Sequence, residues 1–305
     1  RFSFPVAARR AGCKIVLNTD AGTISTFRPA ITMSRDMLSY EPGVIERFGF
    51  GRARLRLILL RYIQNRSLRD ADGAIFLTRY AAEVIQKSCG MLPHIAYIPH
   101  GVGANFKCTE RLGVWPASNA RPIRCVYISN AAMYKHQWVV VLAIAELRKR
   151  GHDVTLTLVG GGMGPAQQML QDAIDVSDPQ GEFVQQLSYV PQSELPSHLS
   201  NADIFVFASS CENMPNTLVE AMAVGLPIAC SNRGPMPEVL SDGGVYFDPE
   251  DDTSIANAIE NIINNAALRA MIARRAKALS DQYSWQRCAD ETWEFMIKTY
   301  RRAKV

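Results

Sequence analysis

Short apolar runs alternate with longer amphipathic stretches over most of the carboxyl half of the chain. The short runs are apolar on both faces, a pattern that is typical of parallel strands covered by helices on both sides of the sheet. The expected strands are 123–129, 154–160, 183–190, 203–209, 227–232 and 245–248, and the expected helices lie at about 138–150, 165–174, 192–200, 215–224, 235–241, 252–265, 267–280 and 285–303. The alternation predicts an α/β fold with a doubly wound, Rossmann-like carboxyl-terminal domain.

The amino half shows fewer strands. Three short apolar runs end in Asp, Thr or Pro, at 14–19, 74–78 and 95–99, and the longest expected helix between them is 52–70. Three strands are few for a doubly wound sheet, which ordinarily has five or six. Since the first residue is also Arg rather than Met, we expect a processed chain or a fragment whose amino-terminal domain is incomplete.

Composition narrows the class of protein. The chain is 48% hydrophobic and 20% charged, as in ordinary soluble globular proteins, and no apolar run reaches the length of a membrane-spanning helix. Its seven cysteines are widely spaced without a C-x-x-C pair, which argues against a disulfide framework or a zinc site and favours the cytoplasm. The net charge of +4 divides into +9 over residues 1–118 and −5 over the rest, so the two halves are expected to meet different partners.

The segment 211–240 follows an expected strand and therefore lies at the carboxyl end of a parallel sheet, where ligands bind in open α/β folds. Pro215 suits the first turn of a helix, which Asn213 or Met214 would cap. Helix amino termini favour phosphates and other anions. Three amides of this turn are expected to stay unpaired and to face the ligand, those of Asn216, Thr217 and Leu218.

Two carboxylates flank the same turn. Glu212 precedes the helix and Glu220 lies in its second turn. Carboxylates accept pairs of hydrogen bonds from vicinal hydroxyls, as a ribose or a hexose presents them. The structural alternatives are a solvated helix face for Glu220 and a carboxylate favoured by the helix dipole for Glu212.

The run E-N-M-P-N-T-L-V-E-A-M-A-V-G-L-P-I resembles the signature of retaining glycosyltransferases of family 4, which have the GT-B fold of two Rossmann-like domains facing a cleft. The resemblance covers nearly all of residues 120–280 and is specific for the family rather than for a substrate. It implies that Glu220 holds the ribose of a sugar nucleotide. It also implies that Glu212, with nearby backbone amides, contacts the transferred sugar.

A second constellation follows the strand 123–129. In similar transferases an Arg shortly after this strand and a Lys five residues later clamp the donor diphosphate. Lys135 matches the Lys, whereas Asn130 stands where the Arg is usual and removes one charge and a bidentate fork. The alternative for Lys135 is a solvated loop lysine, and His136 is interpreted as a structural residue.

Two further positions are assigned to the donor side. The run 159–164 does not have the G-x-G-x-x-G spacing, so we expect no NAD; instead, Gly161 and its neighbours let the backbone pass near the donor. Glu238 begins a short helix and has two interpretations. It either caps the helix as a surface charge or, as the resemblance implies, lies near the donor. In the amino half, Asp20 ends a strand where similar enzymes place a polar residue facing the sugar, and we treat it as a candidate catalytic residue.

The helix expected at 52–66 is amphipathic and basic. Its apolar residues at 55, 58, 59, 62 and 63 fit two interpretations. The commoner one is that they pack against the protein's own sheet. The other is that the helix lies on an anionic membrane, which the charge of the amino half favours.

Together these features predict a GT-B enzyme with a partial acceptor-side domain over 1–115, a donor-binding domain over 116–285 and a terminal helix, 286–305, that crosses back. We expect transfer of a sugar from a nucleoside diphosphate sugar to an acceptor hydroxyl with retention, in cell-surface polysaccharide or glycolipid synthesis. Neither a cofactor nor a metal ion is expected, and the partners are the donor, a glycan or lipid-linked acceptor and a peripheral membrane surface, without nucleic acid. The alternatives are a sugar-nucleotide epimerase of similar fold and a non-catalytic sugar-nucleotide-binding domain.

Overall fold

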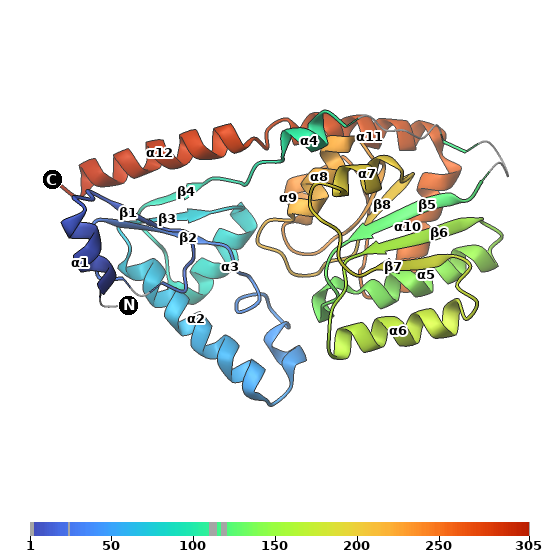
Figure 1. Ribbon diagram of the computed structural model, residues 1–305, viewed down its shortest axis with the longest axis horizontal. Helices are drawn as coiled ribbons and strands as arrows, with labels where there is room; N and C mark the ends of the chain where they lie inside the picture. The colour runs from blue at the N-terminus through green and yellow to red at the C-terminus, as the bar shows by residue number, and fades with distance from the viewer. Residues whose placement is uncertain (1–2, 24, 110–114, 117–120, 305) are drawn as a thin grey trace. The chain divides into compact units, whose positions relative to one another are not determined.

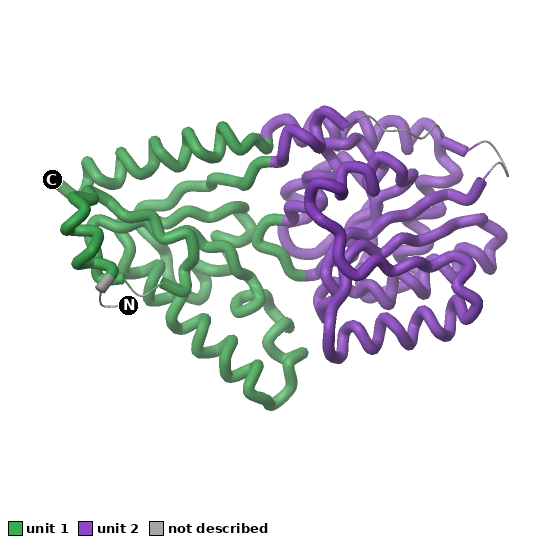
Figure 2. The backbone as a smooth tube through the Cα atoms, in the orientation of Figure 1, with its two compact units in different colours: residues 1–101, 211–214, 283–305 green, residues 102–210, 215–282 purple. Residues whose placement is uncertain are grey.

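The protein, described from a computed structural model over residues 3–23, 25–109, 115–116 and 121–304, forms two compact units (Figure 2). The first unit comprises Arg1–Gly101, Cys211–Met214 and Tyr283–Val305, and the second comprises Val102–Ser210 and Pro215–Gln282. The boundary that the sequence predicted, between residues 115 and 116, lies in a stretch of which 110–114 and 117–120 are outside the described residues. The chain instead passes from the first unit to the second after Gly101.

The first unit contains a parallel sheet in the order β1-β2-β3-β4 (Figure 1). The strands are β1 (Val16–Asn18), β2 (Ala30–Ser34), β3 (Gly73–Phe76) and β4 (Ile95–Tyr97), and the helices are α1 (Ser3–Arg10), the 3-10 helix η1 (Ile45–Phe48), α2 (Arg52–Asp70), α3 (Arg79–Cys89) and α12 (Trp285–Arg302). The expectation of three strands was wrong by one. Strand β2 escaped notice because Thr32 and Ser34 interrupt its apolar pattern, although all five of its residues are buried.

Helix α12 is fixed to the first unit by close packing. The ring of His94 stacks on Phe295 at a centroid distance of 4.6 Å, and its Nε2 lies 3.0 Å from the Thr299 hydroxyl. At Gly101 a Cβ atom would lie 2.0 Å from the backbone nitrogen of Trp285, so only glycine fits where α12 begins. These contacts join the end of the chain to β3 and β4.

Helix α2 corrects the expectation that its apolar stripe packs against the sheet. Gln64 and Leu68 are its buried residues, and both lie in the second half of the helix. The predicted stripe is exposed instead, at Leu55 (68%), Ile58 (42%), Leu59 (58%) and Tyr62 (61%). The stripe has the correct helical spacing, but it faces away from the core.

The second unit contains a six-stranded parallel sheet in the order β10-β9-β8-β5-β6-β7. Its strands are β5 (Ile123–Ile128), β6 (Val154–Val159), β7 (Val184–Leu187), β8 (Ile204–Phe207), β9 (Ile228–Ser231) and β10 (Val245–Phe247). Its helices are α4 (Ala104–Lys107), the 3-10 helix η2 (Met133–Lys135), α5 (Gln137–Lys149), α6 (Pro165–Ser177), α7 (Leu195–Ser200), α8 (Asn216–Val224), α9 (Met236–Leu240), α10 (Asp252–Asn264) and α11 (Ala266–Ser280). The chain extends the sheet in one direction from β5 and in the other from β8, so the two strands meet at a topological switch point.

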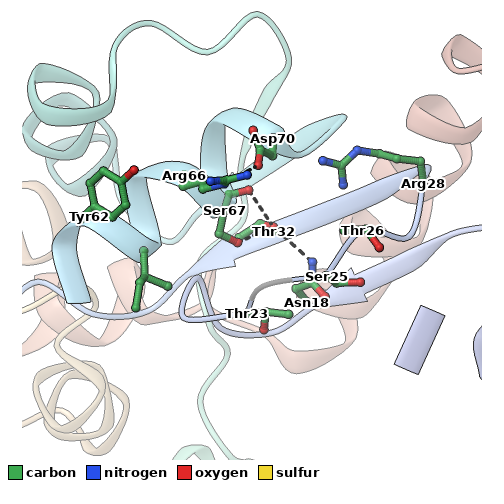
Figure 3. A pocket seen from close by; sticks show the side chains of 11 residues that line it. Asn18, Thr23, Ser25, Thr26, Arg28, Thr32, Tyr62, Arg66, Ser67 and Asp70 are labelled. Atoms are coloured by element: carbon green, nitrogen blue, oxygen red, sulfur yellow. Dashed lines mark hydrogen bonds and ion pairs between the residues drawn. The ribbon is translucent and has the colours of Figure 1, made fainter. Parts of the chain in front are cut away.

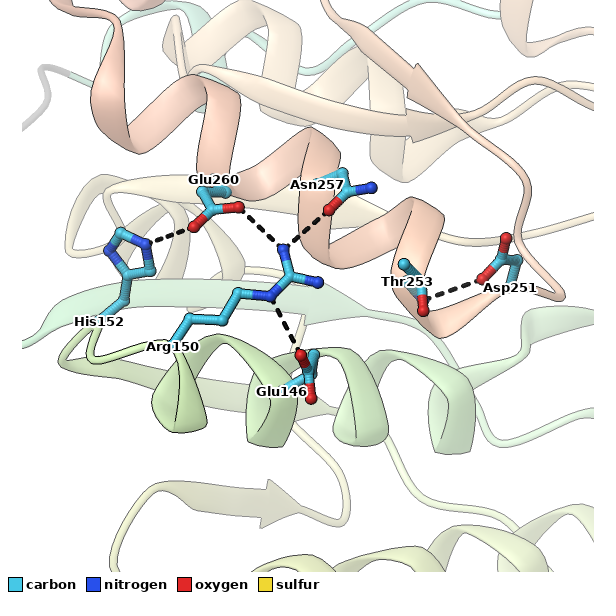
Figure 4. Close-up of polar contacts among 7 residues, drawn as sticks. All are labelled: Glu146, Arg150, His152, Asp251, Thr253, Asn257 and Glu260. Atoms are coloured by element: carbon cyan, nitrogen blue, oxygen red, sulfur yellow. Dashed lines mark hydrogen bonds and ion pairs between the residues drawn. The ribbon is translucent and has the colours of Figure 1, made fainter.

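Two polar clusters secure the amino edge of this second sheet. Asp203, fully buried before β8, accepts hydrogen bonds from Arg121 at 2.6 and 2.9 Å and from the amide of Arg124 in β5 at 2.9 Å. Near the start of β6, Arg150 and His152 both bind Glu260 of α10 at 2.8 Å (Figure 4). Because the carboxyl ends of the strands carry neither cluster, that opposite edge is left for a ligand site.

Candidate functional site

The candidate donor site lies at the carboxyl ends of β5, β6 and β8, around the switch point of the second unit. The segment 129–136 follows β5, and the segment 208–210 follows β8. Both segments meet in a hydrogen bond from the amide of Ser210 to the carbonyl of Tyr134 at 2.8 Å. The fold therefore brings together loops that are more than seventy residues apart in the sequence.

Lys135 is held at this edge by aromatic residues of the two central strands. Its side chain is only 8% exposed, and its backbone carbonyl accepts a hydrogen bond from the Tyr127 hydroxyl at 2.7 Å. Its Nζ lies 5.5 Å from the centre of the Phe207 ring, within cation–π range. Lys135 is therefore a positioned cation rather than a solvated loop lysine.

His136 occupies a left-handed backbone conformation, with φ 48° and ψ 32°, directly before α5. Such a conformation is uncommon for a residue other than glycine and costs about 1 kcal/mol or more, so surrounding contacts must hold it. The side chain is 1% exposed, and its Nε2 lies 2.8 Å from the Ser210 hydroxyl. His136 thus joins the loop that carries Lys135 to the loop after β8, which agrees with the structural role that the sequence indicated.

Glu220 is a buried carboxylate in α8 with one oxygen that accepts no hydrogen bond from the described residues. It is 8% exposed, and burial raises its pKa from 4.5 to about 7, against the lowering effect of a hydrogen bond from Gln192. The orphaned atom is Oε2. Because an unpaired buried carboxylate oxygen is costly, this atom is a strong acceptor for the hydroxyl of a ligand.

The start of α8 differs from the expected capping. Pro215 is the N-cap residue and makes no side-chain cap, so neither Asn213 nor Met214 caps the helix. The amide of Leu218 donates to the carbonyl of Pro215 at 3.1 Å, so the expectation that this amide stays unpaired was wrong. Asn216 is exposed and Thr217 half-exposed at the first turn.

The glycines after β6 are required by contact between loops. A Cβ at Gly160, where φ is 117°, would lie 2.4 Å from the carbonyl oxygen of Ser129. The carbonyl of Gly161 accepts a hydrogen bond from the amide of Ala131 at 3.2 Å. The backbone after β6 therefore packs against the loop after β5 that leads to Lys135.

The other donor-side candidates are more open. Asn130 is exposed, and Glu238 is exposed in the first turn of α9. Gln137 is a residue that the sequence analysis missed: it is 1% exposed, its Nε2 donates to the carbonyl of Ser129 at 3.0 Å, and its Oε1 has no partner among the described residues. No sequence pattern distinguishes this glutamine, because its burial arises from the fold.

Glu212 and Asp20 belong to the first unit, each in a different loop. The segment 211–214 is held there by Asn213, whose carbonyl accepts from the Thr78 hydroxyl at 3.0 Å and whose amide donates to the Asp36 carbonyl at 3.3 Å. Asp20 is exposed after β1, and its Oδ1 accepts from the amide of Gly22 at 2.7 Å in a local turn.

A half-buried carboxylate of the first unit, that of Glu41, was not expected from the sequence. Burial raises the pKa of Glu41, while a hydrogen bond from the Tyr80 hydroxyl opposes the shift. Its Oε2 has no partner among the described residues. Glu41 lies in a polar stretch without helical or strand periodicity, so nothing in the sequence marked it.

Comparison with known families identifies the family to which the donor-side residues belong. The profile of the family described as Glycosyl transferases group 1 matches residues 116–279, more than half of the chain. The chain belongs to this glycosyltransferase family. The matched range holds Lys135, Glu212 and Glu220 and most of the second unit.

Two curated relatives of the chain are named as mannosyltransferases. The chain is 30% identical over 241 residues to a GDP-mannose-dependent alpha-(1-6)-phosphatidylinositol monomannoside mannosyltransferase of Mycolicibacterium smegmatis, covering 71% of this chain and 60% of that protein. It is 30% identical over 135 residues to the O-antigen chain mannosyltransferase B of Escherichia coli, covering 44% of this chain and 35% of that protein. The chain thus spans roughly a third to three fifths of the length of these relatives.

Solved structures establish the fold of the chain. Sucrose-phosphate synthase from Thermosynechococcus elongatus superposes with a TM-score of 0.79 at 17% identity, covering 98% of this chain and 77% of that one. Anabaena HepE in complex with UDP gives a TM-score of 0.68 at 19% identity, covering 95% and 75%. The predicted α/β fold of GT-B type, with two parallel-sheet domains, is confirmed.

Membrane-spanning helices and metal-ligand clusters are both absent from the described residues. None of the helices there combines the length and apolarity needed to cross a membrane. Likewise, no group of three or more His, Cys, Asp or Glu side chains in the described part of the chain is arranged to hold a metal ion.

Proposed function

We propose that this protein transfers a sugar from a nucleoside diphosphate sugar to an acceptor hydroxyl with retention of configuration. The acceptor is a glycan or a lipid-linked sugar of cell-surface polysaccharide or glycolipid synthesis, on the cytoplasmic side of a membrane. The named activities of the mannosyltransferase relatives support this class of reaction. The sugar nucleotide enters as substrate, and the proposal assigns no resident cofactor.

The observation that carries the proposal is the orphaned oxygen of Glu220 in the same unit as the buried ammonium of Lys135. A nucleoside diphosphate offers the two matching groups, vicinal ribose hydroxyls and a dianionic diphosphate. Hydrogen bonds from hydroxyls would satisfy Glu220, and the diphosphate would meet Lys135 and the amino-terminal turn of α8.

The proposed step breaks the bond between the anomeric carbon and the diphosphate oxygen. The bonding pair leaves with the diphosphate, whose developing charge Lys135 stabilises. The acceptor oxygen then forms the new bond on the face that the diphosphate left, and its proton passes to the departing phosphate oxygen. Glu212 and Asp20 stay candidates for contacts to the transferred sugar.

The test measures nucleoside diphosphate release from GDP- and UDP-sugars with and without glycan and glycolipid acceptors. The proposal expects release that depends on the acceptor, with a glycosylated product of retained configuration. Epimer formation without nucleotide release would favour an epimerase. Donor binding that Glu220→Ala abolishes, without transfer to any acceptor, would instead identify a binding domain.

A further inference from the structure

Helix α2 presents an apolar stripe that no part of the described chain covers. Leu55, Ile58, Leu59 and Tyr62 are spaced by three and four residues and therefore share one face of the helix. They are between 42% and 68% exposed, and Phe50, just before the helix, is fully exposed. Burying one such side chain is worth about 1.5–3 kcal/mol, so a face of this kind points to a partner.

The stripe faces outward because it lies on the side of α2 opposite to the residues that are buried. The buried residues Gln64 and Leu68 lie about half a turn around the helix from the stripe. They anchor the second half of α2, whereas the first half carries no buried residue. Figure 1 shows α2 running away from the sheet of the first unit along this exposed half.

The charge around the stripe is predominantly positive, although Arg66 pairs with Asp70 at the end of the helix at 3.3 Å. Residues 47–69 contain seven arginines and no Asp or Glu. The exposed arginines nearest to the stripe by helical position are Arg52, Arg56, Arg66 and Arg69. Apolar side chains flanked by guanidinium groups match the interface of an anionic bilayer, where acyl chains lie beneath phosphates.

A cavity of about 400 Å³ opens beside the stripe, between α2 and the sheet face that carries Asn18 and Thr32 (Figure 3). Tyr62 and Arg66 belong to both the helix surface and the cavity lining. The remaining lining is rich in hydroxyls, at Thr23, Ser25, Thr26, Thr32 and Ser67. Arg28 and Asp70, which lies 3.3 Å from Arg66, also line it, so the cavity suits a hydroxyl-rich headgroup of the same bilayer.

We infer that the outward face of α2 docks on an anionic lipid bilayer, with Leu55 and Leu59 inserted among the acyl chains and the flanking arginines at the level of the phosphates. The cavity beside Tyr62 and Arg66 then receives a lipid headgroup. The inference rests on the proposed function for the lipid-linked acceptor, because docking would bring the first unit to the surface where such an acceptor resides. Docking itself requires no transfer reaction.

The test is flotation of the chain with vesicles of phosphatidylcholine alone or with one third phosphatidylglycerol. Binding is expected only to the anionic vesicles and to weaken with added salt. Reversing Arg52 and Arg56 to Glu is expected to lower the partition coefficient at least about tenfold. Replacing Leu55 and Leu59 with Ser is expected to lower it about tenfold or more.

Matched controls come from the second unit. Lys149→Glu with Arg274→Glu makes the same change of charge at two exposed cations, and Leu142→Ser with Met271→Ser removes two exposed apolar side chains. Both controls are expected to float as the parent does. All variants should bind nucleotide equally, so a failure of docking is distinguished from a failure of the proposed function.

Three results would overturn the inference. The first is equal flotation with neutral and anionic vesicles. The second is flotation of the α2 variants equal to that of the controls. The third is self-association of the parent that the Leu55 and Leu59 changes abolish, which would show that a second copy covers the stripe.

Discussion

Replacing Glu220 with glutamine separates what this side chain does for the fold from what it does for the donor. The glutamine has nearly the same shape but stays neutral at every pH. Burial raises the pKa of Glu220 from 4.5 to about 7, so ionising it costs the folded protein about 3 kcal/mol relative to the unfolded chain. Because the folded pKa is raised, the protonated carboxyl contributes stability that is fully present below pH 4.5 and is lost as the pH rises through about 7.

The variant is therefore expected to be more stable than the parent at about pH 8, by up to about 3 kcal/mol, and to resemble it at about pH 4.5. Donor binding is expected to change in the opposite direction. Hydroxyls donate more strongly to the ionised carboxylate, so the parent's affinity for GDP or UDP should rise between about pH 6 and about pH 8. Losing charge-assisted hydrogen bonds of about 1.5–3 kcal/mol would weaken binding ten- to a hundredfold at the upper pH.

Urea unfolding and titration calorimetry across this pH range measure both effects. Glu182→Gln, at an exposed carboxylate of the same unit, is the control and should change neither. A Glu220→Gln variant that loses stability at high pH would contradict the account of burial. A variant whose nucleotide affinity keeps the parent's value and pH dependence would refute the role in donor binding.

Three other predictions concern the second unit. Lys135→Met keeps the packing of the side chain but removes its charge, and steady-state kinetics should show kcat/KM reduced about a hundredfold, whereas an unchanged value would remove Lys135 from the site. Asp203→Asn leaves the Arg121 guanidinium without its carboxylate between β5 and β8, and urea unfolding should show a loss of about 2–3 kcal/mol; a loss within error would refute the importance of this pair. Glu260→Gln removes a carboxylate whose pKa is lowered by hydrogen bonds from His152 and then Arg150, so it should cost about 1 kcal/mol at neutral pH. Since that folded pKa lies below 4.5, the difference between variant and parent should vanish as the pH falls through it, and a constant difference would point to packing instead.

The second unit was largely predictable because β8 and β9 are buried throughout and β5 over its last four residues, so these central strands are mostly apolar in sequence. Strand β2 was not predicted, because its hydroxyl side chains are buried in the fold but make the sequence look as polar as a loop. The sequence could not show, for a different reason, whether the apolar face of α2 points to the core or to the solvent. A stripe with three- and four-residue spacing is the same whether it meets a core or a membrane, and the outcome depends on where the sheet ends.

The residues of the candidate site also fall into those that the sequence predicted and those that it did not. Lys135 and Glu220 were predicted because each lies in a recognisable motif after a strand. Gln192 and Glu41 were missed because their partners, Glu220 and Tyr80, lie about thirty or forty residues away and only the fold brings them together. Likewise, Asn213 does not cap α8, because its side-chain amide Nδ2 donates to the backbone carbonyl of Asp36 in the first unit.

The central claim is that the second unit binds a nucleoside diphosphate sugar through Glu220 and Lys135. Its most direct test is a crystal structure of the chain soaked with GDP- and UDP-sugars. The account predicts ribose hydroxyls within hydrogen-bonding distance of the Glu220 carboxylate and diphosphate oxygens at the Lys135 ammonium. A nucleotide bound elsewhere, with the Glu220 carboxylate still lacking a partner, would contradict it.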